Sequence, residues 1–221
     1  MPIVELVGRV SLFGRHLWQE HSAGLSIMLI SIVYHSGYGH TARQAEAVAE
    51  GARRVAGTDV NLVSIGDGEI PWDTLEASDA IIFGSPTYNG LISAKFKEFM
   101  EASTKTAWFE QKWLNKIAAG FTNSGAQHGD KLNSLVSIAL FAAQHGMTWV
   151  NLGLMPGNSS STGSVNDLNR IGSWLGAMAQ SNNDQAPDVT PIKSDLDTAA
   201  HLGQRVAEIT QRFVSGSTQS K

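Results

Sequence analysis

Residues 27–56 combine an apolar strand, a turn of small polar residues and an amphipathic helix. Residues 27–34 form a nearly unbroken apolar run, which is typical of a strand covered on both faces of its sheet. The segment SGYGHT at residues 36–41 turns tightly, and small apolar residues then recur at helical spacing. This arrangement favours an α/β fold in which strands alternate with covering helices.

The turn at residues 36–41 is a candidate anion site. Thr41 is expected to cap the helix, and Gln44, three residues later, completes a capping box. The free N–H groups and the dipole of a helix N-terminus attract negative charge, so we interpret the turn as a phosphate cradle. An ordinary strand–helix turn with a good cap explains these residues equally well. The turn matches neither the dinucleotide fingerprint nor a Walker loop, which favours a single phosphate monoester.

The composition limits the partners of the chain. A length of 221 residues suits one domain, and a net charge of −4 argues against nucleic acid or an anionic membrane. The absence of cysteine excludes disulfides, thiolate metal sites and a cysteine nucleophile, and it is compatible with a cytoplasmic location. No apolar run approaches the roughly 20 residues that a membrane span needs. No metal-binding motif is evident.

Residues 27–215 are expected to form a single domain. Residues 1–26 do not match the pattern that follows, and we interpret them as an N-terminal extension, either an accessory arm or a mis-assigned start. Residues 216–221 are expected to fray.

Four further strands are expected to alternate with helices along the chain. The strands are expected at residues 59–65, 80–84, 116–122 and 148–152, and the helices at residues 72–77, from about Ser93, after a cap at Asp130 and after a cap at Ser194. The alternation predicts a flavodoxin-like doubly wound parallel sheet of five strands in the order 2-1-3-4-5, within a three-layer αβα fold.

Two of the later segments carry further expectations. The helix after Asp130 is expected to bury the apolar residues that recur at helical spacing, namely Leu132, Leu135, Val136, Ala139, Leu140 and Ala143. Residues 156–185 are rich in Gly, Ser and Asn and show no clear structure, which indicates a functional or mobile segment.

Three polar loops follow strands of this sheet, at residues 36–41, 85–90 and 123–129. The carboxyl ends of parallel strands lie at one edge, and ligands of doubly wound sheets bind outside that edge. The convergence of three loops rich in glycine, hydroxyl and amide groups therefore favours a phosphate-bearing cofactor.

Several motifs resemble the WrbA family of flavodoxin-like, FMN-dependent NAD(P)H:quinone oxidoreductases. SGYGHT is similar to the family's S-x-Y-G-H phosphate loop, PTYNG to its P-T-R-F-G, and NSGAQHG to its S-T-G-T-G-G-G. The family's arginine and phenylalanine fall on Tyr88 and Asn89, and Gln144 replaces the first histidine of its His-His-Gly-Met. The resemblance covers about residues 28–153.

The resemblance implies an FMN site built from these loops. The FMN-binding residues that it implies are Ser36, Gly37, Tyr38, Gly39, His40 and Thr41 at the phosphate, Pro86, Thr87, Tyr88, Asn89 and Gly90 along the flavin ring, Asn123, Ser124, Gly125, Ala126, Gln127 and His128 on the other flank, and Gln144 and His145. Tyr38 and Trp108 are expected to face the substrate.

The leading functional hypothesis is an FMN-binding enzyme that transfers hydride from NAD(P)H to a quinone-type acceptor. A flavodoxin-like electron carrier without a nicotinamide site, and a flavin-free sensory or interaction module, are the alternatives. Exposed aromatics such as Trp108, Trp113 and Trp174 are expected to complete the flavin face from a neighbouring chain. A homodimer or homotetramer is therefore expected.

Overall fold

A parallel sheet forms the centre of the computed structural model, which describes residues 27–66 and 68–218. Its core order is β2-β1-β3-β5-β6. Three strands lie at the middle of this order, β1 (Met28–Tyr34), β3 (Ala80–Tyr88) and β5 (Ile117–Ser124). β2 (Thr58–Ser64) and β6 (Thr148–Trp149) lie at the edges, and all four pairings are parallel. The doubly wound sheet predicted from the sequence is confirmed, and the expected N-terminal extension lies outside the described residues.

Two short strands share the fifth position of the sheet. β6 pairs with the start of β5, and β7 (Ala177–Gln180) pairs in parallel with its end, from Phe121 to Ser124. The strand expected at residues 148–152 therefore begins where expected but ends at Trp149, and the segment at 156–185, which shows no clear structure in the sequence, contains β7. The backbones approach closely here, because a Cβ on Gly176 would lie 2.1 Å from the Gly120 carbonyl oxygen.

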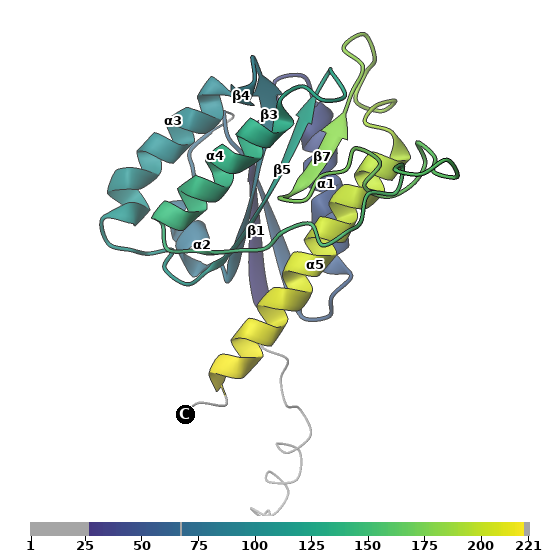
Figure 1. Cartoon of the computed structure of the whole chain (residues 1–221). Helices are drawn as coiled ribbons and strands as arrows, with labels where there is room; N and C mark the ends of the chain where they lie inside the picture. Colours follow the sequence, from purple (N-terminus) through teal and green to yellow (C-terminus); the bar gives the residue numbers. More distant parts are fainter. Residues whose placement is uncertain (1–26, 67, 219–221) are drawn as a thin grey trace, which may run out of the picture.

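Helices cover both faces of the sheet, as Figure 1 shows. α1 (His40–Arg53) and α5 (Lys193–Thr218) pack on one face, around a core that includes Ile30, Ile32 and Phe121. On the other face lie α2 (Trp72–Ala77), α3 (Ala94–Ser103), the π-helical segment η2 (Thr104–Trp108) and α4 (Lys131–Gln144). No helix in the described ranges is long and apolar enough to span a membrane.

The N-terminus of α1 differs from the predicted capping box. Gly39 occupies the cap position with φ 88°, and no side chain caps the helix. The Ala42 N–H donates instead to Ser36 Oγ at 3.1 Å. Gln44 points into the core, where its amide donates to the Ala177 carbonyl at 3.4 Å. The box does not form because Thr41 already lies inside the helix and is buried.

Two other predicted caps are also wrong. Asp130 holds the cap position of α4 with φ 54°, and its side chain makes no cap hydrogen bond. Ser194 lies within α5, and its hydroxyl donates to the Val165 carbonyl at 2.7 Å. Ser93 does cap α3, by accepting from the Phe96 N–H at 3.2 Å.

The second loop is shorter than expected, because β3 continues to Tyr88. It turns at Asn89 and Gly90 into β4 (Leu91–Ile92), which pairs with β3 in antiparallel fashion. At the C-terminus, α5 extends to Thr218, beyond the expected end of the domain at residue 215.

The buried face of α4 is rotated from the predicted one. Leu135 and Ile138 are fully buried, whereas Leu132, Val136 and Leu140 are 55%, 49% and 60% exposed. These three residues recur at every fourth position and form an exposed apolar stripe. The sequence pattern is apolar around most of this helix, so periodicity does not decide which side faces the sheet.

α1 and α5 contact each other through glycines. A Cβ on Gly51 would lie 1.8 Å from the Ala200 carbonyl oxygen, and one on Gly203 would lie 1.9 Å from the Val48 carbonyl oxygen. Rigid backbone atoms occupy both positions, so the helices approach this closely only because these residues lack side chains.

Replacing Gly203 with Ala should destabilise the fold by about 1–3 kcal/mol, the usual cost of overpacking, despite the better helix propensity of alanine. Gly216→Ala is the matched control, because no atom lies within 4 Å of its added Cβ. That variant should gain up to about 1 kcal/mol. Urea unfolding of both variants measures the effect, and equal midpoints would contradict the packing argument.

Candidate functional site

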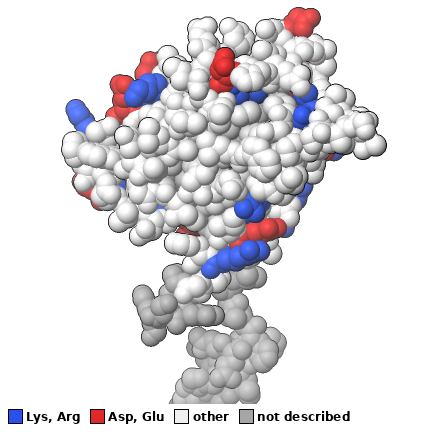
Figure 2. Space-filling model, in the orientation of Figure 1, with Lys and Arg blue, Asp and Glu red and all other residues white. Residues whose placement is uncertain are grey.

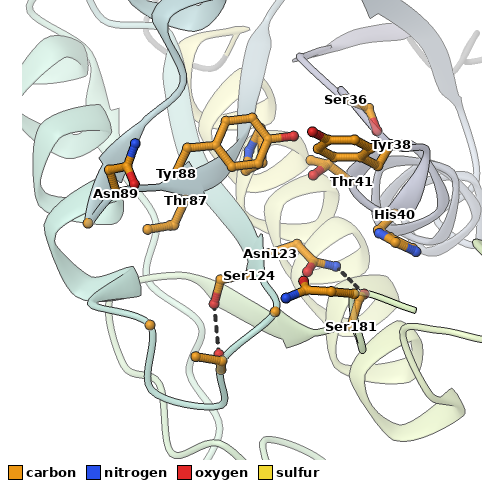
Figure 3. Close-up of a pocket in the computed structure, with 16 residues that line it drawn as sticks. Ser36, Tyr38, His40, Thr41, Thr87, Tyr88, Asn89, Asn123, Ser124 and Ser181 are labelled. Carbon is orange, nitrogen blue, oxygen red and sulfur yellow. Dashed lines mark hydrogen bonds between the residues drawn. The ribbon is translucent and has the colours of Figure 1, made fainter. Parts of the chain in front are cut away.

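The loops after β1, β3, β5 and β7 surround a cavity of ≈ 520 Å³ at the carboxyl edge of the sheet (Figure 3). α1 follows β1 onto one face and α3 follows β3 onto the other, so the cavity lies where the strand order reverses. Its volume falls within the roughly 300–1,000 Å³ of small-molecule sites. The lining residues are Ser36, Tyr38, His40, Thr41, Pro86, Thr87, Tyr88, Asn89, Gly90, Asn123, Ser124, Gly125, Ala126, Gly129, Ser181 and Asn183.

The first loop offers an anion backbone N–H groups and hydroxyls. No side chain caps α1 at Gly39. Within the first turn, the Ala42 N–H donates to Ser36 Oγ and the Arg43 N–H to the Gly39 carbonyl, so the N–H groups of His40 and Thr41 are the ones available to a ligand. Ser36 and Thr41 contribute hydroxyls to the lining. The lining residues include no lysine or arginine. A phosphate here therefore depends on hydroxyls and the helix N-terminus.

Tyr88 reaches from the end of β3 across the cavity to the first loop (Figure 3). A Cβ on Gly37 would lie 2.6 Å from the Tyr88 hydroxyl, so only glycine allows this approach. The Tyr88 and Tyr38 rings meet edge to face, with centroids 6.2 Å apart. Burial, and secondarily the nearby Tyr38, raise the pKa of the Tyr88 phenol. Tyr88 therefore presents a neutral hydroxyl and an aromatic ring.

Two hydroxyl contacts hold Thr87, at the end of β3, in place. Thr87 Oγ1 lies 2.7 Å from both Thr122 Oγ1 and Ser134 Oγ. These contacts tie β3 to β5 and α4, so Thr87 is held rigidly against the cavity.

Hydrogen bonds join the third loop (residues 123–129) to the fourth loop, which follows β7 and begins at Ser181. Asn123 Nδ2 donates to Ser181 Oγ at 2.8 Å (Figure 3), and the Ser181 N–H donates to the Ser124 carbonyl at 3.1 Å. Gln180 Nε2 donates to the Gly125 carbonyl at 2.9 Å. Gly39 also contacts this loop, because its added Cβ would lie 2.5 Å from Pro187 Cγ.

Sequence reasoning missed Gly129, Ser181 and Asn183 as lining residues. The sequence places Gly129 in the third loop but indicates no role for it. Ser181 and Asn183 follow β7, a short strand inside a segment that was expected to be irregular. The Ser-Asn-Asn run after AMAQ was the available signal.

Several expected site residues do not line the cavity. Gly37 and Gly39 belong to the first loop but are not among the residues that line the cavity. Gln127 and His128 border a neighbouring hollow beside Trp174.

Gln144, His145 and Trp108 lie at the far end of α4, around another hollow. None of these three residues lines the cavity itself, although Gln144 also borders a groove that shares Tyr88 and Asn89 with the cavity.

His145 belongs to the core. Its ring lies between Trp113 and Phe141, at centroid distances of 4.4 and 4.7 Å, and its Nε2 lies 3.0 Å from Ser103 Oγ. Burial lowers the pKa of His145 to about 4. The imidazole is therefore neutral near pH 7 and is not a proton donor there.

The relatives of the chain are named as a flavodoxin and as quinone dehydrogenases. The family model described as NADPH-dependent FMN reductase matches residues 72–159. Flavodoxin FldP of Pseudomonas aeruginosa is 42% identical over 186 residues, which cover 82% of this chain and 96% of the relative. An NAD(P)H dehydrogenase (quinone) of Archaeoglobus fulgidus is 32% identical over 208 residues, covering 83% and 98%.

A solved structure agrees with these relatives. A flavodoxin, WrbA-like protein from Agrobacterium tumefaciens superposes with a TM-score of 0.64 at 40% identity, covering 84% of this chain and 98% of that one. The chain belongs to the WrbA-type flavodoxin-like family. Membership makes it a flavin oxidoreductase with FMN as cofactor. The cavity fits this cofactor, since its ≈ 520 Å³ reach from the N-terminus of α1, which no side chain caps, to the aromatic side chain of Tyr88.

The neutral state of His145 has a measurable consequence for stability. Because its folded-state pKa lies below the usual 6.5, the unfolded chain binds the proton first. The contribution of His145 to the free energy of unfolding should therefore decrease as the pH falls from 6.5 towards 4. Denaturant unfolding of the wild type and His145→Asn should show a steeper loss in the wild type. Parallel curves would contradict the assignment.

Proposed function

We propose that the chain passes hydride from NAD(P)H to a quinone-type acceptor through FMN. The FMN would bind in the cavity of ≈ 520 Å³ that Ser36, Tyr88 and Ser181 help to line. The observation that carries the proposal is the convergence of the three predicted loops on one cavity at the switch point of the sheet. When bound, FMN supplies the chemistry by accepting hydride at its N5 atom and passing two electrons to the acceptor.

The residues of the chain bind and orient the cofactor in this proposal. The hydroxyls of Ser36 and Thr41 and the N–H groups at the start of α1 hold the phosphate. Thr87 is locked by its two hydroxyl partners and supports the ring. Asn123, fixed by Ser181, supplies amide contacts on the other flank.

An apolar groove offers the acceptor a route to the cavity. Tyr88 and Asn89 line both the cavity and a groove of ≈ 600 Å³ between α3 and α4. Leu91, Met100 and Phe141 give this groove an apolar wall. Such a wall suits the flat, weakly polar ring of a quinone. Tyr38 is 77% exposed and lies at the mouth, where it is available to an incoming substrate.

A carrier function is the second candidate, because the relative at 42% identity is named a flavodoxin. A carrier binds FMN but does not accept hydride from a nicotinamide. Anaerobic addition of NADH or NADPH to the FMN-loaded protein separates the two. Loss of absorbance near 450 nm supports the enzyme, and retained absorbance supports the carrier.

Thr41→Val should weaken FMN binding by roughly tenfold or more, because a lost hydrogen bond to a charged group costs about 1.5–3 kcal/mol. Thr106→Val is the matched control, since that hydroxyl lies on η2 and donates to the Ala102 carbonyl. Quenching of FMN fluorescence gives both dissociation constants. Equal FMN affinity of Thr41→Val and the wild type would contradict the placement of the phosphate at the first loop.

We further propose that the chain forms a homodimer through the exposed stripe of α4, Leu132, Val136 and Leu140. Figure 2 shows few charged side chains over the part of the surface where α4 lies. Trp113 cannot serve as an interface aromatic, because it is 1% exposed and stacks in the core with Phe99.

Val136→Glu places a charge in the middle of this stripe and should convert the dimer to a monomer. Phe213→Glu on α5 is the control, because Phe213 is similarly exposed, at 51%. Light scattering coupled to gel filtration reports the mass of each variant. A wild-type monomer at high concentration, or a dimer that tolerates Val136→Glu, would refute this interface.

A further inference from the structure

We propose that Lys131 is a positioning residue, whose charged side chain holds the third loop (residues 123–129) in the conformation that binds FMN. This inference rests on the proposed FMN site, because Ser124 and Ala126 of that loop line the cavity. Lys131 itself does not line the cavity, so it acts through the loop.

The Lys131 side chain is fully buried and ends inside the loop. Nζ donates to Ser124 Oγ at 2.8 Å, to the Ala126 carbonyl at 2.9 Å and to the Gln127 carbonyl at 2.8 Å. An ammonium group has three donors, and these three acceptors use all of them. Every one of the contacts goes to the third loop.

These contacts fix the direction of two peptide groups. A trans peptide is planar, with its C=O and N–H pointing in opposite directions. Since the Ala126 and Gln127 carbonyls point at Nζ, the N–H groups of Gln127 and His128 point away from it. The loop is also tight, because a Cβ on Gly129 would lie 2.3 Å from Ser124 Oγ. Losing the ammonium would release both peptide groups together.

The position of Lys131 is unfavourable in every other respect. It is the first residue of α4, where the positive end of the helix dipole opposes a cation. Burial lowers the pKa of Lys131 to about 8, despite the opposing influence of Asp195. No ion pair to Lys131 is present in the described structure. A lysine that breaks local preferences beside a cofactor site indicates a functional demand.

The charged groups around Lys131 are already engaged. Arg170 Nε and Nη2 each donate to the Asp195 carboxylate at 2.8 Å. Asp195 also accepts from the Gln180 N–H at 2.9 Å, and Gln180 in turn binds Gly125. His128 and Asp130 flank Lys131 on the loop and are exposed. The loop is thus anchored by Lys131 on one side and by the Arg170–Asp195 pair on the other.

Loss of the Lys131 proton should loosen the loop. As the pH rises through about 8, the ammonium becomes a neutral amine. A neutral amine retains only two donors, and hydrogen bonds from a charged donor are about twice as strong as neutral ones. FMN affinity should therefore fall between pH 7 and pH 9.

Lys116 provides a matched control. Its Nζ donates to the Glu76 and Ser78 carbonyls at 2.6 Å each, and burial lowers its pKa. It precedes β5, at the opposite edge of the sheet from the cavity. Lys116→Met therefore removes a half-buried lysine that bonds to backbone carbonyls without touching the third loop.

The test measures FMN dissociation constants by fluorescence quenching at pH 7 and pH 9. Lys131→Met should bind roughly tenfold more weakly than the wild type at pH 7, and equally at both pH values. Lys131→Arg, which keeps its charge, should restore most of the affinity without the pH dependence. Lys116→Met should match the wild type in affinity and in its weakening at pH 9.

Amide hydrogen exchange of residues 124–129 in flavin-free protein gives a readout that does not need the cofactor. Lys131→Met should exchange faster there than Lys116→Met. Unchanged exchange, or an FMN affinity of Lys131→Met that equals the wild type at both pH values, would overturn the inference. A wild type that binds no FMN would instead defeat the proposed function, and the exchange data would then decide the role of Lys131. If Lys131→Met does not fold, an FMN affinity of the wild type that is flat from pH 7 to pH 9 would overturn it.

Discussion

The parallel pairing of β3 with both β1 and β5 is the constraint on which the site depends. In this register Tyr34 lies beside Gly84, and Pro86 lies beside Asn123. The three strands therefore run in the same direction to one edge of the sheet, where three loops far apart in sequence meet. A shift of one residue would turn every side chain to the opposite face. The buried apolar residues of these strands fix the register, and the register in turn fixes the cavity.

Much of this arrangement follows from the sequence, because strong periodicity and glycine-rich turns are local signals. The alternation of buried strands and helices gives the sheet order, and the order gives the edge at which ligands bind. What failed depends on tertiary contacts. Gln44 was a plausible capping residue, but the core offered its amide the Ala177 carbonyl. β7 has only four residues, too few to be recognised from the sequence. The sequence therefore does not predict that Ser181 and Asn183, which follow it, line the cavity. The expected role of His145 rests on motif similarity, which carries no information about its packing between Trp113 and Phe141 in the core.

The residues that line the cavity are mostly neutral, whereas the residues that support its loops include buried charges. The lining itself holds hydroxyls, amides and backbone groups, with His40 as its only basic side chain among the described residues. The strong charges lie behind the lining: Lys131 binds atoms of the third loop, and Arg170 and Asp195 bind each other and Gln180 of β7. A site built this way keeps its shape through buried charge while presenting a neutral surface to a ring.

The division of the fifth strand position between β6 and β7 also affects how the sheet can associate. β6 has two residues and β7 has four, and residues 150–176 loop out between them. Long, flat edges recruit other strands, whereas short, interrupted edges do not. This border of the sheet therefore offers no continuous template on which a foreign strand or an amyloid-like stack can grow. The segment that brings Ser181 to the cavity thus also protects the sheet from aggregation along that side.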